Sequence, residues 1–201
     1  MFKINYNPIL ERWNSRIANI SIEKKKLIEK NIDLNENLKV IKRTRRTRRD
    51  GDIFICSLND FVYYYGKVLR ANILNPSNNW INGCSLICIF REKTKEKNLG
   101  NYKGNCNNLL CVPNIVTSQY WSNGWFETIG NIPLTDEETR LDYGFYRKDF
   151  IGKNGSFFKE NGEMMDHIPK FFDSYGVTSL NGIYMDIRVE TIIDPSLLKM
   201  D

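Results

Sequence analysis

Several features that mark other protein classes are missing from this 201-residue sequence. No apolar run approaches the roughly 20 residues of a membrane span, and the segment Met1–Pro8 lacks the apolar stretch of a secretory signal. Glycine-rich phosphate loops, nucleophile elbows and metalloprotease motifs are also missing. We therefore expect a soluble, cytoplasmic protein that uses none of these common catalytic motifs.

Cysteine is present in an odd number, five residues, which does not suit a fully disulfide-bonded secreted fold. We expect free, mostly buried thiols. A four-cysteine zinc site built from Cys84, Cys88, Cys106 and Cys111 is the alternative. If residues 84–90 form a strand, the sulfurs of the first pair lie roughly 13 Å apart, which is too far for one zinc ion. We therefore predict no metal site and no cofactor.

Charge is divided unevenly along the chain, whose formal net charge is +5. Residues 1–50 carry 14 Lys/Arg and 6 Asp/Glu, a balance of +8, whereas residues 51–201 have a balance of −3. The basic excess therefore belongs to the N-terminal part, and the rest of the chain is mildly acidic. We divide the chain into an N-terminal helical extension, residues 1–41, and a β-rich domain, residues 42–201.

Two apolar segments separated by Asn59 and Asp60 form the strongest hairpin signal. The first covers Asp50–Leu58 and the second covers Phe61–Leu69. Both faces of the first segment are apolar, which predicts a hairpin that is covered on both sides at the centre of the core. Gly66 interrupts the second segment and indicates a bulge or a close backbone approach.

The segment from Pro8 to Glu36 has the periodicity of an amphipathic helix. Its apolar residues recur at spacings of three and four, namely Leu10, Trp13, Ile17 and Ile20, with Leu27 and Ile28 continuing the face. Pro8 suits the first helical turn, and Ser21 can divide the segment into two helices. We expect the apolar face to pack on the body of the protein; the alternative is a helix that recognises a partner.

Asn-Gly pairs occur five times, at residues 82–83, 123–124, 154–155, 161–162 and 181–182. This pair is favoured in type I′ hairpin turns because both positions need a positive φ. Cys84–Phe90 and Leu109–Val116, the latter interrupted at Pro113, are further strand candidates, and Pro169–Gly176 suggests a short helix. The pattern predicts an α+β, predominantly β fold: a curved antiparallel sheet or small barrel-like core with an N-terminal helical extension.

Lys42–Arg49 forms a basic arm in which six of eight residues are Lys or Arg. Such a run binds phosphates readily. Its candidate phosphate-binding side chains are Arg43, Arg45, Arg46, Arg48 and Arg49. The arm contains no aromatic residue on which a nucleic-acid base can stack. The alternative is a solvated connector, or an edge strand whose charges discourage aggregation.

His167 is the only histidine and the only candidate for an imidazole base. It follows Glu163 and Asp166, so a carboxylate–imidazole pair is possible. The sequence assigns no nucleophile or substrate-positioning group to accompany it, and the segment Glu160–Glu163 has the composition of a turn. We therefore predict that the protein is not an enzyme, and a hydrolase built around His167 is the weakest alternative.

Several short motifs of the β-rich part occur in a recognisable series. After the basic arm they are Gly51–Phe54, Tyr65–Val68, Trp121 to Gly124, Phe126-Glu127 and Ile129-Gly130. Over about residues 42–193 this series resembles the immunity protein 26 family of bacterial polymorphic toxin systems. The resemblance implies a mostly β fold and an antidote that binds a co-produced toxin protein, and it implies no catalytic residue.

Under this hypothesis the toxin is blocked through a protein–protein interface with a few aromatic anchors. Trp121 and Trp125 flank a turn and are candidate anchors, with core packing as their alternative role. Glu137, Glu138 and Asp142 belong to an acidic loop that can attract a basic toxin, or they form a solvated loop. The competing hypothesis is a nucleic-acid-binding module that uses the basic arm.

Overall fold

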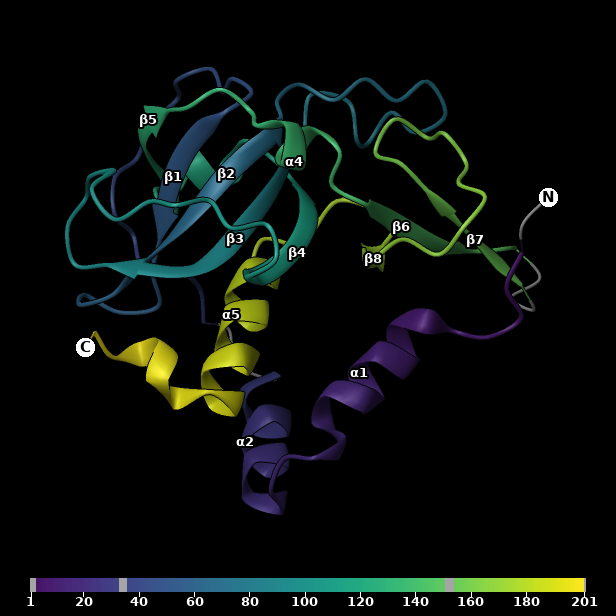
Figure 1. Ribbon diagram of the computed structural model, residues 1–201, viewed down its shortest axis with the longest axis horizontal. Helices are drawn as coiled ribbons and strands as arrows, with labels where there is room; N and C mark the ends of the chain where they lie inside the picture. Colours follow the sequence, from purple (N-terminus) through teal and green to yellow (C-terminus); the bar gives the residue numbers. More distant parts are fainter. Residues whose placement is uncertain (1–2, 33–35, 151–153, 201) are drawn as a thin grey trace.

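Two open β-sheets form the body of the protein, and the three longer helices lie along one side of it (Figure 1). The structure is a computed structural model that describes residues 3–32, 36–150 and 154–200. Within these residues strands predominate over helices, and neither sheet closes into a barrel. The predicted α+β, predominantly β class is confirmed, and the open sheets decide against the barrel-like alternative.

The larger sheet contains five antiparallel strands in the order β4-β3-β2-β1-β5. Its strands are β1 (Asp52–Cys56), β2 (Tyr63–Arg70), β3 (Ser85–Thr94), β4 (Leu109–Val116) and β5 (Glu127–Asn131). β4 continues through Pro113, where the sequence predicts an interruption. The proline is tolerated because β4 lies at the edge of the sheet, where one side of the backbone needs no partner strand.

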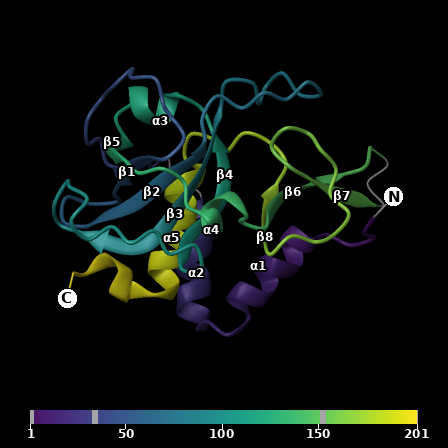
Figure 2. The same ribbon diagram turned by 45° about the horizontal axis from the view of Figure 1, so that its top comes forward.

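The smaller sheet lies beside the larger one, as both views show (Figures 1 and 2). Its strands are β6 (Tyr143–Lys148), β7 (Gly155–Phe158) and β8 (Phe171–Ser174), in the order β7-β6-β8. β6 runs antiparallel to β7 and parallel to β8, with Tyr143 opposite Phe171. The prediction of a helix over Pro169–Gly176 is therefore wrong, because pairing with β6 makes this aromatic segment a strand.

The helical elements are α1 (Pro8–Ala18), α2 (Ile22–Ile32), α3 (Gln119–Ser122), α4 (Asp136–Thr139), α5 (Gly182–Ile193) and a 3-10 turn at Pro195–Leu198. Pro8 lies in the first turn of α1, and the side chain of Asn7 accepts the backbone N–H groups of Ile9 and Leu10. The predicted division near Ser21 is confirmed. None of the helices that the structure describes combines the length and apolar character needed to cross a membrane.

The N-terminal helices pack on the body through α5. Ile28 of α2 is 3 % exposed and lies in one apolar cluster with Val189 and Ile192 of α5. Trp13 and Ile17 of α1 pack against the same cluster. Trp13, Ile17, Ile20 and Ile28 of the predicted apolar face therefore pack on the protein itself, whereas Leu10 and Leu27 of the same face are exposed.

The central hairpin of β1 and β2 has the predicted geometry. Ile53 and Phe54 are fully buried in two different core clusters, so the hairpin is covered on both faces. Phe54 lies opposite Gly66, where the pairing between β2 and β3 also shifts register. A Cβ atom on Gly66 would lie 2.2 Å from Cζ of Phe54. Position 66 therefore requires glycine, because the Phe54 ring occupies the space that a side chain would need.

The five Asn-Gly pairs do not form type I′ turns, so that prediction is wrong. Asn72, which belongs to none of these pairs, is the only non-glycine residue with a positive φ in the part of the chain that the structure describes. The pairs serve other purposes: Asn181, for example, precedes α5, and Gly155 begins β7. In the pair Asn123-Gly124 the asparagine is the C-cap of α3 and the glycine takes a positive φ, which is a common way to end a helix.

All five cysteines are free and buried, as predicted. Cys84 directly precedes β3 and Cys88 lies within it, while Cys106 precedes β4 and Cys111 lies within it. Among the described residues, no group of three or more histidine, cysteine, aspartate or glutamate side chains is arranged to hold a metal ion.

Candidate functional site

The two tryptophans predicted as anchors occupy different environments. Trp121, in α3, is 1 % exposed; its indole N–H donates to Oγ1 of Thr128 at 3.0 Å, and its ring meets Phe54 edge-on at 5.5 Å. Trp121 therefore has the alternative role, core packing, and its indole is not at the surface. Trp125 is half-buried, with its ring 5.6 Å from that of Tyr120, and it remains a candidate contact.

Trp80 is the exposed tryptophan, 88 % accessible, and Leu74 on the same loop is 73 % accessible. Both lie in residues 71–84, which we call the Trp80 loop. At the base of the loop the Ile73 N–H donates to the Cys84 carbonyl, and the Gly83 N–H donates to the Ile73 carbonyl. Across its middle the Asn75 N–H donates to Oδ1 of Asn82 at 2.6 Å. The protein thus exposes two large apolar side chains on a loop with defined internal hydrogen bonds.

The Trp80 loop is also anchored to the smaller half of the molecule. The Asn75 amide donates to the Tyr175 hydroxyl at 2.7 Å and to the Glu160 carbonyl at 2.8 Å. The sequence signal for its exposure is the Asn/Pro/Ser-rich stretch that precedes Trp80. Local sequence does not distinguish an exposed tryptophan from the buried Trp121, which also follows a polar turn.

The acidic candidates Glu137 and Glu138 also differ in exposure. Glu138 is buried, and its Oε2 lies 2.7 Å from Nζ of Lys67, which is itself 1 % exposed. Glu138 also accepts the backbone N–H of Thr135 in a capping box that starts α4. Its carboxylate is therefore committed to the interior. Glu137 is exposed and accepts from the Asn107 amide at 3.1 Å, so it remains available to a partner.

Asp142 joins His167 in a small surface cluster. The two ring nitrogens of His167 lie 2.9 Å from Asp166 and 3.0 Å from Asp142. Hydrogen bonds, to Asp166 first and then to Asp142, raise the pKa of His167. The histidine is exposed and lines none of the described cavities. This arrangement lacks the water-excluding cleft expected around an imidazole base.

The basic arm lies against the body as irregular chain rather than as an edge strand. Its Thr44 N–H donates to the Trp121 carbonyl at 3.1 Å. Arg48 is anchored: Nε donates to Oγ of Ser85 at 3.0 Å, and the guanidinium lies 5.4 Å from the Trp121 ring centre. Arg46 lies 3.9 Å from Asp52. These contacts fix the course of the arm.

The other three arginines of the arm point outward. Arg43, Arg45 and Arg49 are exposed, and their side chains make no ion pair with any residue that the structure describes. Arg48 also reaches the Gly83 carbonyl at 3.4 Å, so the arm runs beside the Trp80 loop. The arm therefore contacts the base of the loop that carries Trp80.

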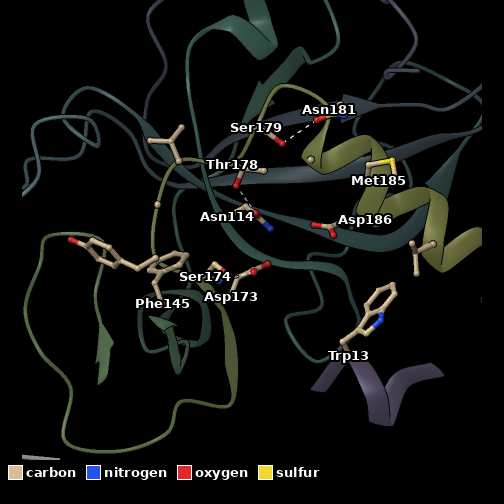
Figure 3. A pocket seen from close by; sticks show the side chains of 15 residues that line it. Trp13, Asn114, Phe145, Asp173, Ser174, Thr178, Ser179, Asn181, Met185 and Asp186 are labelled. Carbon is tan, nitrogen blue, oxygen red and sulfur yellow. Dashed lines mark hydrogen bonds between the residues drawn. The ribbon is translucent and has the colours of Figure 1, made fainter. Parts of the chain in front are cut away.

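A cavity of about 610 Å³ lies between α1, α5 and the two sheets, and sequence analysis did not indicate it (Figure 3). Trp13 of α1 lies at one end, and the carboxylates of Asp173 from β8 and Asp186 from α5 lie toward its middle. Asn114 of β4 lines it and accepts a hydrogen bond from the Thr178 hydroxyl at 2.6 Å. Four separate chain segments build this site, so no local motif could reveal it.

Asp186 is the unusual group of this cavity. Burial raises its pKa to about 7, and the neighbouring charge of Asp173 acts in the same direction, whereas Arg16 and Arg12 act against it. No residue that the structure describes donates a hydrogen bond to its carboxylate or pairs with it within 4 Å. Perturbed carboxylates in cavities are frequent at binding sites.

Comparison with protein families gives one match, to a family model described as immunity protein 26, over residues 49–155. The match covers more than half of the chain and spans β1 to β6 and the start of β7. α1, α2, β8 and α5 lie outside it. Comparison with curated proteins and with solved structures gives no match.

Proposed function

Because the chain belongs to the immunity protein 26 family, we propose that it is an immunity protein that binds a cognate toxin protein and neutralises it by occlusion. The family match over residues 49–155 is the observation that carries this proposal. Neutralisation by binding needs a contact surface and no chemical step. The exposed position of His167 away from the cavities is consistent with a protein that acts without catalysis.

We place the centre of the toxin interface on the Trp80 loop. The loop exposes both a tryptophan and a leucine, and tryptophan is enriched among the residues that dominate binding energy at protein interfaces. The internal hydrogen bonds of the loop lower the entropic cost of presenting these side chains to a partner. Trp125, Glu137 and Asp142 are candidate contacts on other surfaces.

Growth protection tests the proposal. The toxin domain encoded beside this chain is expressed in a bacterial host with and without the chain, and growth is followed. We expect growth to be restored by the chain and reduced again by Trp80→Ala, which should weaken toxin binding by about 30-fold or more, the cost of removing one dominant contact.

Phe61→Ala is the matched control, because Phe61 is 75 % exposed on the β1–β2 turn and lies outside the Trp80 loop. It should leave protection intact. A toxin that still kills cells producing the wild-type chain would refute the proposed function. Protection that survives Trp80→Ala would refute only the placement of the interface.

A second candidate function is nucleic-acid binding through the basic arm. The specific observation is that Arg43, Arg45 and Arg49 are exposed on an arm whose Arg48 contacts the base of the loop that carries the exposed Trp80. Cationic side chains next to an aromatic ring suit a single strand, whose phosphates pair with the cations while a base stacks on the ring.

Salt dependence distinguishes this second candidate. Binding of a labelled oligonucleotide, measured by fluorescence anisotropy, should weaken steeply with salt, with a slope of about −0.7 for each phosphate contacted in a single strand. The triple variant Arg43→Ala, Arg45→Ala, Arg49→Ala should abolish it, whereas Arg140→Ala, a change at an exposed arginine of α4's C-terminal end, should not. Absence of binding at low salt would eliminate this function.

A further inference from the structure

The cavity between α1 and α5 has the size of a small-molecule site. Its volume of about 610 Å³ lies within the roughly 300–1,000 Å³ common for such sites. Its walls combine apolar side chains, among them Met185 and Val189, with amide and hydroxyl groups, among them Asn114 and Ser179 (Figure 3). A few polar groups on apolar walls are typical of sites that orient a ligand.

The cations near this cavity already have partners, one of which is Asp173 of the cavity itself. Arg16 pairs with Glu190, and Arg91 pairs with the other oxygen of the same carboxylate. Arg12 donates to the Phe172 carbonyl. Its guanidinium also lies 3.9 Å from Asp173, at the limit of an ion pair. Asp186 therefore has no ion pair within 4 Å, although the guanidinium groups of Arg12 and Arg16 lie close enough to lower its pKa. The charged residues that line the cavity itself are the two carboxylates, Asp173 and Asp186.

An aromatic wall accompanies this charge. The indole of Trp13 lies at the end of the cavity nearest Asp186 (Figure 3). Arg16 of the same helix lies 5.9 Å from the Trp13 ring centre, which shows that a guanidinium can occupy this environment. Carboxylates beside an indole are complementary to a cation with an apolar stem, since the head pairs with oxygen and the stem contacts the ring.

We propose that this cavity binds an organic cation, a guanidinium or alkylammonium group held between Asp173, Asp186 and Trp13. The cation comes either from a free small molecule or from an arginine or lysine side chain of a protein partner; the recognising chemistry is the same. Trp13, Asp173 and Asp186 lie outside the family match, whereas Asn114 and Phe145 of the cavity wall lie inside it, and none of the lining residues belongs to the Trp80 loop.

The ionisation of Asp186 gives the site a distinctive pH dependence. The titratable and charged groups around it are Arg12 and Arg16 of α1, Cys111 of β4, Tyr120 of α3, Asp173 of β8 and Glu190 of α5. A cation binds the ionised carboxylate, and the pKa of Asp186 in the free protein is about 7. Affinity therefore rises as the pH is raised through about 7.

Titration followed by the ¹H–¹⁵N indole signals of the full chain tests the site, with Trp13→Phe identifying the Trp13 signal. The probe is n-butylguanidinium, and the matched neutral probe is n-butylurea. We expect a saturable shift of the Trp13 signal with the cation and no saturation with the urea. Asp186→Asn should weaken binding by about tenfold or more, the loss of one charged hydrogen bond.

Asp60→Asn is the control variant, because Asp60 is an exposed aspartate on the β1–β2 turn, far along the chain from every lining residue of the cavity. It should leave the affinity unchanged. If Asp186→Asn does not fold, Asp173→Asn replaces it, with the same expected loss. Agmatine and the blocked peptide acetyl-Gly-Arg-Gly-amide separate the sources: tighter binding of agmatine indicates a free ligand, and tighter binding of the peptide indicates a partner's side chain.

Three results would overturn the proposal. They are equal binding of the urea and the guanidinium, the absence of any saturable shift of the Trp13 signal, and unchanged affinity in a folded Asp186→Asn protein. None of these bears on growth protection by the Trp80 loop, so the two proposals fail separately.

Discussion

Lys67 and Glu138 bring two opposite charges into the interior, with side chains 1 % and 2 % exposed. Lys67 also donates to the Pro133 carbonyl at 3.2 Å, and Glu138 accepts from the Thr135 backbone. The pair therefore ties β2 to the segment that leads into α4. Desolvation offsets much of the attraction in such pairs, but removal of one partner leaves an uncompensated charge.

Glu138→Leu should consequently lower the free energy of unfolding by about 3–5 kcal/mol, measured by urea denaturation. The double change Lys67→Met, Glu138→Leu should recover most of that loss, because no buried charge remains. Arg140→Ala, which removes an exposed pair with Asp136, is the control and should cost less than about 1 kcal/mol. Equal destabilisation by the single and double changes would contradict this account.

Gly66 has no space for a side chain, because the ring of Phe54 covers its Cα. Gly66→Ala should destabilise the protein by about 1–3 kcal/mol through overpacking. Phe54→Leu removes the ring atoms that an alanine methyl group would meet. The double variant should therefore lose less stability than the sum of the two single changes, as measured by thermal denaturation. Strict additivity would show that the ring is not the obstacle.

The raised pKa of Asp186 predicts that the stability of the protein depends on pH. Its folded-state pKa, about 7, is raised above the ordinary aspartate value of 3.8, so between about pH 4 and pH 7 the folded state holds more protons than the unfolded state. The contribution of Asp186 to stability therefore falls as the pH rises through this window. The full destabilisation caused by the Asp186 carboxylate is present above about pH 7 and disappears below about pH 4.

Asp186→Asn removes this pH-dependent contribution to the free energy of unfolding. Above pH 7 the variant should be more stable than the wild type by about 1–3 kcal/mol, after allowance for solvent screening, and the difference should vanish near pH 4. Urea denaturation at a series of pH values measures it, with Asp60→Asn as the control. A wild type that is as stable as Asp186→Asn at every pH would show that the carboxylate is not destabilised.

At the scale of the secondary structure elements, attachment of α2 depends on one buried side chain. Ile28 is 3 % exposed against α5, whereas Ile22 of the same helix is 67 % exposed. Ile28→Asp should release α2 from the body, because it places an unpaired charge in an apolar contact. Hydrogen exchange should then show lost protection in α2 while β1 to β3 stay protected.

Ile22→Asp makes the same chemical change at an exposed site and should leave exchange in α2 unaltered. Loss of protection throughout the larger sheet on Ile28→Asp would instead mean that the N-terminal helices and the sheet unfold as one cooperative unit.

Some of these elements follow from the local sequence pattern, whereas others depend on pairing with distant strands. The β1–β2 hairpin and the division of the N-terminal segment could be predicted, because apolar periodicity and turn residues act within a few positions. β8 could not, because its conformation depends on parallel pairing with β6, about 25 residues earlier in the chain. The Asn-Gly pairs depart from their preferred turn as well, since among the residues that the structure describes no asparagine of a pair has the positive φ that this turn needs.

At the scale of the whole molecule, the sites depend on contacts between distant segments. Lys67 and Glu138 are 71 residues apart, and the cavity joins Trp13 to Asp186. Sequence reasoning found the family and the basic arm but chose Trp121 rather than Trp80 as an exposed aromatic residue. Burial of a tryptophan is decided by the elements that cover it, and these become visible only in the assembled fold.

The central claim is that the molecule acts by binding a toxin protein. Isothermal titration of the purified chain with the toxin domain encoded beside it measures this most directly. The account predicts one-to-one binding with a Kd below about 1 μM, the range expected of a specific interface of standard size. No heat of binding at low salt, together with full toxicity in cells that produce the chain, would contradict it.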